Sequence, residues 1–298
     1  MPSRRALIIA SIVFLVLGIL LSLLPMYGSR RSESRMEEVS IRDVPKDFVL
    51  ATNYLKLSTD AMVNASMGKP FSVPSNDDLD RLITRLKDYA MGINVGYGEL
   101  AKVLMRASRA YLSMANASKY VIEILPDLSN VVAELREALR DLSMCRIDEA
   151  LEIYRSIEKD LHNVRNNLSL ASTNLLMVDE DALLSKGHRR ILNRSLDTML
   201  KLGESLASIE KLFQVIERDR SIVEAVCMGK NVDLNLVNRA LEDLRNVEYR
   251  GSENLASEFY DAKQSLGDAL LRIAMSYSTK TSGVQGHGAG YAVPSSDD

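Results

Sequence analysis

The two cysteines of this 298-residue chain, Cys145 and Cys227, carry its most specific side-chain chemistry. Each ends a predicted helix and lies on or beside the apolar stripe of that helix. If the predicted helices 127–144, 148–175 and 188–227 alternate in direction, the first and third are parallel, and both cysteines lie at one end of the bundle. We therefore predict a disulfide between them, which an oxidising compartment would preserve. The alternative is that both are buried free thiols.

Four Asn-x-Ser triplets are candidate glycosylation sites, and their asparagines are Asn64, Asn116, Asn167 and Asn193. Glycans are attached to such triplets in secreted proteins. The Asn, Ser and Thr content of the chain gives about two of these triplets by chance. Four is a mild excess, which fits a body that faces outward.

The remaining residues that could do chemistry form no site in the sequence. His162, His188 and His287 are far apart, and none has a second ligand at helical spacing. The acids at 179–181 lack the spaced ligands of a calcium loop, so a cluster of charges at a helix start is favoured. The sequence has no Gly-rich phosphate loop, His-Glu-x-x-His, Cys-x-x-Cys or Gly-x-Ser-x-Gly. We predict no catalytic residue, no metal site and no cofactor, and a protein that is not an enzyme.

The first apolar run of the chain, Ala6 to Leu24, has no charged residue. As a helix it is roughly 28 Å long, close to the hydrocarbon thickness of a bilayer. We predict a single transmembrane anchor whose partner is the lipid bilayer through residues 6–24. Because the short head before it is basic, we expect the N-terminus in the cytoplasm and the helical body outside the cell membrane.

Two alternatives to a retained anchor remain open. A cleaved secretory signal has a shorter apolar core, of about 7 to 15 residues, and a small-x-small exit that is missing from residues 25–29. Arg4-Arg5-Ala6 followed by Leu7 resembles the archaeal type IV pilin-like signal. That resemblance implies a surface subunit cut before Leu7. Such subunits usually carry a β-rich head, which is not predicted here.

Composition favours an acidic, helical body. The chain is 46% hydrophobic and 26% charged, which is ordinary for folded protein. Residues 1–35 hold five Arg and one Glu, and the rest holds 32 basic and 39 acidic residues. An acidic body lacks the electrostatic footprint of a nucleic-acid binder, so we expect no nucleic-acid partner. Aromatics are scarce and Trp is absent, which favours helices over strands.

The predicted fold is all-α: an N-terminal transmembrane helix followed by an elongated antiparallel helical bundle with heptad-like seams. One such seam is Leu128, Val132, Leu135, Leu139 and Leu142. The predicted helices cover about 47–66, 77–125, 127–144, 148–175 and 188–227, followed by one after Asp233 and one from Ser252 to 277. The second of them is predicted to break near 94–98 and to end at Pro126. The predicted domains are a signal-anchor (1–28), a juxtamembrane stalk (29–46), the bundle (47–277) and a flexible Gly/Ser-rich tail (278–298).

These features predict a scaffold or assembly subunit. Long helices that bury their stripes on one another act most simply through protein contacts, with an unknown protein partner or by self-association. The leading alternative is a ligand-sensing helical ectodomain that works with a partner. The pilin-like surface subunit is the second alternative.

Overall fold

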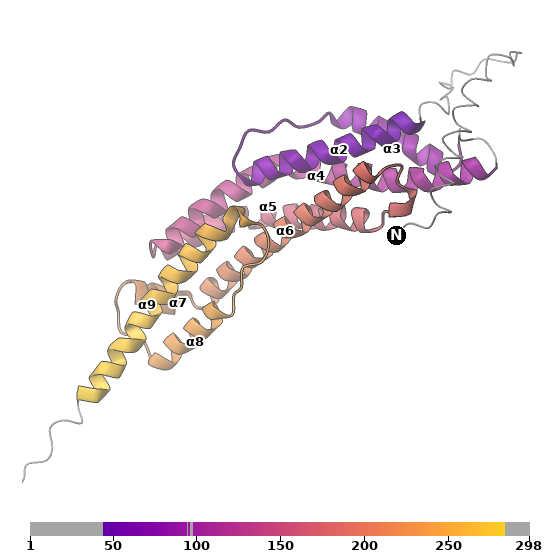
Figure 1. The fold of residues 1–298 in the computed structure, drawn as a ribbon. Helices are drawn as coiled ribbons and strands as arrows, with labels where there is room; N and C mark the ends of the chain where they lie inside the picture. Colours follow the sequence, from indigo (N-terminus) through magenta and orange to yellow (C-terminus); the bar gives the residue numbers. More distant parts are fainter. Residues whose placement is uncertain (1–43, 94, 96–97, 284–298) are drawn as a thin grey trace, which may run out of the picture. The chain divides into compact units, whose positions relative to one another are not determined.

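The computed structural model describes residues 44–93, 95 and 98–283. The chain divides into two units, Met1–Val39 and Ser40–Asp298, and all of the described residues belong to the second. These residues form helices and no strand, so the predicted all-α class is confirmed for them (Figure 1). The helices are α2 (Val44–Ser66), α3 (Asn76–Ala90), α4 (Glu99–Ser143), α5 (Ile147–Leu176), η1 (Glu180–Ala182), α6 (Lys186–Arg218), α7 (Arg220–Cys227), α8 (Leu234–Arg245), η2 (Glu253–Leu255) and α9 (Ala256–Gly283).

The predicted anchor, residues 6–24, lies outside the described residues, as does most of the predicted stalk. Within the part of the chain that the structure describes, no helix combines the length and apolarity needed to cross a membrane. α2 begins at Val44, inside the predicted stalk, because Val44 is buried and Pro45 suits the first turn of a helix. At the other end α9 continues past the predicted limit of the bundle at Tyr277.

α4 organises the bundle. It has 45 residues, a length of about 67 Å, and packs against α2, α3, α5 and α9. The predicted helix end at Pro126 is wrong, since Pro126 lies inside α4. Proline in a helix interior costs about 3 kcal/mol, but Leu125 and Leu128 on either side of it are fully buried. Their burial on neighbouring helices outweighs the lost backbone hydrogen bond, and the proline itself is exposed.

The predicted single helix 188–227 is also wrong, because it is two helices. α6 ends at Arg218 and α7 begins at Arg220, with Asp219 between them in a non-helical conformation. The Asp219 side chain is buried and accepts a hydrogen bond from Arg218 at 3.1 Å. This local pairing favours a break in the backbone where the sequence pattern indicates continuity.

The order of the helices follows from their side-chain pairs. Arg155 of α5 pairs with Glu217 of α6, and Arg165 pairs with Glu210, so the partner numbers fall as α5 advances. α5 and α6 are therefore antiparallel. α4 and α5 are joined by a short corner and make the most extensive contact in the bundle. α4, α5 and α6 consequently alternate in direction.

Apolar and aromatic side chains fill the space between the helices. Leu135, Leu206 and Leu266, one from each of three predicted seams, are fully buried or nearly so. Two aromatic stacks join distant segments. Phe48 of α2 lies on Tyr111 of α4 with ring centroids 4.4 Å apart, and Tyr154 of α5 stacks on Phe213 of α6 at 4.5 Å.

Candidate functional site

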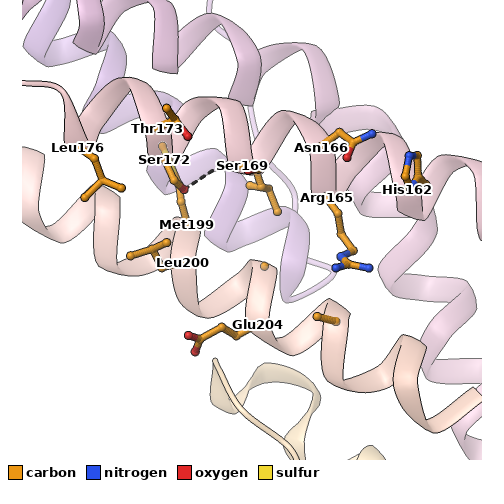
Figure 2. Close-up of a pocket in the computed structure, with 13 residues that line it drawn as sticks. His162, Arg165, Asn166, Ser169, Ser172, Thr173, Leu176, Met199, Leu200 and Glu204 are labelled. Carbon is orange, nitrogen blue, oxygen red and sulfur yellow. Dashed lines mark hydrogen bonds between the residues drawn. The ribbon is translucent and has the colours of Figure 1, made fainter.

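A groove runs between α5 and α6 on the surface of the bundle (Figure 2). Its volume is about 520 Å³. Both helices contribute side chains at helical spacing, because their antiparallel pairing exposes one stripe from each. The lining residues are His162, Arg165, Asn166, Leu168, Ser169, Ser172, Thr173, Leu176, Met199, Leu200, Gly203, Glu204 and Ala207.

The two ends of the groove differ in polarity. Figure 2 shows Leu176 and Leu200 together at one end, and Asn166 and His162 at the other. The apolar end is open to water, since Leu176 is 65% and Leu200 is 43% exposed. At the polar end Arg165 is paired with Glu210 of α6. The groove therefore has two exposed leucines at one end and an ion pair towards the other, and Glu204 lies between Leu200 and Arg165 in Figure 2.

Small side chains open the middle of the groove. At Gly203 an added Cβ atom would have no neighbour within 4 Å. Ala207 lies one turn further along α6, and Ser169 and Thr173 face the space from α5. Side chains of this size leave room for a second backbone to approach closely.

Ser172 and His162 are two polar residues of the groove. The Ser172 hydroxyl donates to the Leu168 carbonyl oxygen at 2.8 Å, so its hydrogen is used within its own helix. His162 is exposed, in line with the prediction that it is a solvated residue. Among the residues in the described ranges, no cluster of three or more His, Cys, Asp or Glu could hold a metal ion.

The predicted cysteine pair lies at the far end of α4. The structure joins Cys145 to Cys227, with their Cα atoms 5.6 Å apart. Cys145 directly follows α4 and Cys227 ends α7, so alternation of the helices brings them together. For the mature protein the bond stays a prediction.

Cys145 adopts a backbone conformation that favours glycine. Its φ is 60°, and the Arg146 N–H donates to the Asp141 carbonyl oxygen at 2.9 Å, as in a Schellman helix end. Gly68 and Gly229 fill the corresponding position at two other corners. A non-glycine residue there costs about 1 kcal/mol or more. A cysteine stands at this corner in spite of that cost, because it forms the disulfide with Cys227.

Charged side chains surround the disulfide. Arg146 pairs with the mostly buried Asp141, and Arg220 pairs with Asp148 of α5 and with Glu224 of α7. These contacts tie α7 to the start of α5 beside the covalent bond. The sequence shows Arg220 only as an interruption of an apolar stripe.

The four candidate glycosylation asparagines all lie in helices. Asn193 is exposed, whereas Asn64, Asn116 and Asn167 are half-buried. Ser195, the serine of the Asn193 triplet, is buried and accepts a hydrogen bond from Thr59 at 2.9 Å. A glycan at Asn193 would therefore have to be attached before the bundle folds, and glycosylation stays a prediction.

A polar contact that the sequence did not indicate joins α4 to the start of α6. The Tyr111 hydroxyl lies 2.6 Å from His188 Nδ1 and accepts a hydrogen bond from the Leu184 N–H at 2.9 Å. Burial raises the pKa of Tyr111 to about 12 and lowers the pKa of His188. A neutral His188 can accept the tyrosine hydrogen at Nδ1. The two residues are 77 positions apart, so no local pattern links them.

The acids at 179–181 belong to the corner between α5 and α6. Asp179 caps η1 by accepting a hydrogen bond from the Asp181 N–H at 3.1 Å. Arg106 of α4 also binds Asp179, and that hydrogen bond lowers the pKa of the Asp179 carboxyl. The cluster therefore starts a short helix and ties the corner to α4. His287 lies outside the described residues.

No protein-family model, curated protein or solved structure matches the chain.

Proposed function

We propose that this protein is a membrane-anchored extracytoplasmic scaffold or assembly subunit that acts through protein contacts. The apolar run from Ala6 to Leu24 supports the anchor, and the basic head before it supports an outward-facing body. The observation that carries the proposal is the groove between α5 and α6. Its exposed leucines and small central residues suit the apolar face of a partner helix.

A partner helix in the groove would gain most of its binding free energy at the end with Leu176 and Leu200. Leu176 and Leu200 expose side chains that a partner would cover, and covering a leucine fully is worth about 1.5 to 3 kcal/mol. Gly203 and Ala207 would let the two backbones approach closely. The polar end, with Asn166 and the Arg165–Glu210 pair, would fix the direction of the partner.

A ligand-sensing ectodomain is the second candidate, and the size of the groove favours it. A volume of about 520 Å³ lies within the range of small-molecule pockets, about 300 to 1,000 Å³. In that role a partner subunit would carry the signal across the membrane.

The test is crosslinking in native membranes followed by affinity purification of the full chain. Three forms are compared: the unchanged chain, Gly203→Leu, which places a large side chain in the groove, and the matched control Gly203→Ala. We expect the unchanged chain and Gly203→Ala to recover the same protein. With Gly203→Leu its recovery should fall about tenfold, which corresponds to about 1.4 kcal/mol.

Equal recovery from all three forms would contradict a contact in the groove. A small molecule that copurifies with the unchanged chain and is lost from Gly203→Leu would support the sensor instead. Circular dichroism of the purified variants shows whether each one is folded.

A further inference from the structure

Two corners of the bundle lie at the end where α2 begins. The α3–α4 corner follows Ala90, and the α5–α6 corner follows Leu176. Arg106 of α4 binds Asp179 of the second corner, and Tyr111 of α4 accepts a hydrogen bond from Leu184. Figure 1 shows the start of α2, the start of α4 and the end of α5 at the same end of the bundle.

Large apolar side chains are exposed on these corners and on the first turns of α4. They are Met91, Ile93, Val103, Met177 and Leu184, which we call the basal surface. Met177 is 73% exposed, the largest value for any large hydrophobic residue in the described part of the chain. Exposed apolar side chains at one end of a bundle are a candidate site of protein or membrane contact.

The charge at this end is opposite to that of the rest of the body. Residues 44–50, 85–111 and 176–190 hold nine Lys or Arg and six Asp or Glu, a net charge of +3. The other residues of the range 44–283 include 22 basic and 28 acidic ones, a net charge of −6. A basic end on an acidic body complements an anionic surface.

We infer that the basal surface binds the surface of a bilayer that contains anionic lipid. The apolar side chains of the two corners enter the headgroup region, and the surrounding Lys and Arg side chains bind lipid phosphates, as in interfacial membrane proteins. This inference rests on the proposed membrane anchor. It adds that the body is held against the membrane by its base.

The test uses the full, unreduced chain reconstituted into phosphatidylcholine vesicles with or without phosphatidylglycerol. A cysteine carrying a fluorophore is introduced by Met177→Cys at the base or, as a control, by Leu236→Cys on α8, where the native side chain is also exposed. Nitroxides on the lipid acyl chains quench fluorophores that enter the bilayer surface. We expect quenching several-fold stronger at 177 than at 236, and stronger when phosphatidylglycerol is present.

Flotation of the vesicles separates this inference from the proposed function. A chain that does not float with vesicles contradicts the anchor itself. A chain that floats but shows equal quenching at the two positions overturns the basal contact and leaves the anchor standing. Protection of position 177 only in native membranes, where other proteins are present, would also overturn it, because the occupant would then be a protein.

Charge reversal tests whether basic side chains at the base bind anionic lipid. Arg109→Glu with Arg190→Glu changes two exposed cations near the base, and we expect it to remove the effect of phosphatidylglycerol on quenching at 177. Lys159→Glu with Lys230→Glu makes the same change in net charge at exposed positions away from the base. An equal loss with both pairs would show that net charge, and not the basal surface, controls the contact.

Discussion

The two ends of the bundle are held together by different chemistry. At the end where α2 begins, noncovalent polar contacts join the helices: Asp47 accepts from Arg85 at 2.8 and 2.9 Å and from Tyr89 at 3.1 Å, and Tyr111 meets His188. At the far end, a disulfide with neighbouring ion pairs ties α4 to α7. The comparison predicts that the stability of the far end depends on oxidation, whereas the stability of the near end responds to pH and to single polar substitutions.

Removal of the disulfide should give the largest loss in the free energy of unfolding. Cys145→Ser with Cys227→Ser opens a loop between residues 82 positions apart, which costs about 4 to 5 kcal/mol in the chain-entropy account. Denaturant unfolding of the oxidised and mutant chains measures the loss. Thiol counting on denatured, unreduced protein tests the bond directly. Two free thiols in material matured outside the cytoplasm would contradict it.

Core truncation should cost nearly as much, independently of oxidation. Leu135→Ala, Leu206→Ala and Leu266→Ala should each lower the free energy of unfolding by roughly 2 to 5 kcal/mol, because each leucine is fully buried or nearly so. The measurement is denaturant unfolding, repeated after reduction. Losses below about 0.5 kcal/mol at all three positions would mean that the seams do not form the core.

A smaller effect is expected at the near end. Asp47→Asn keeps the size of a buried side chain but removes the charge that accepts three hydrogen bonds from Arg85 and Tyr89. We expect a loss of about 1.5 to 3 kcal/mol, the range for hydrogen bonds to a charged group. Faster amide exchange should be confined to the start of α2 and to α3. Equal acceleration around Cys145 would show that the two ends are not independent.

The smallest expected effect is a dependence of stability on pH through His188. Burial lowers the pKa of His188 in the folded state below its ordinary value of 6.5, so the unfolded chain binds the proton more readily. The contribution to stability is complete above about pH 6.5 and is lost as pH falls through the lower folded pKa. Thermal unfolding across this range should show the decline, and His188→Gln should reduce it. A decline of the same size in both proteins would place its origin in other groups.

Much of the bundle could be predicted because its helices repeat local patterns. The seam at Leu135 and the corners near Gly68 and Gly229 follow from apolar spacing and turn chemistry. The sequence pattern predicts a helix end at Pro126 and a continuous helix through Asp219, and both predictions are wrong. Burial of Leu125 and Leu128 on neighbouring helices overrides the proline, so the deciding contacts there are tertiary. At Asp219 a buried side chain that pairs with its neighbour Arg218 interrupts the stripe.

The candidate site was less predictable. The cysteine pair follows from the order of the helices, which short corners indicate. The groove depends on how far apart α5 and α6 lie, and the sequence carries no direct signal of that distance. Small residues such as Gly203 and Ala207 on a stripe of otherwise larger side chains were the one available sign.

The central claim is that the helical body stays anchored through its first apolar run, and N-terminal sequencing of the mature protein from the membrane fraction tests it most directly. We predict a chain that still contains Ala6 to Leu24 and that resists extraction by high salt. A chain that starts at Leu7 would instead support the pilin-like subunit. A soluble chain that starts near residue 29 would mean secretion and would contradict the account.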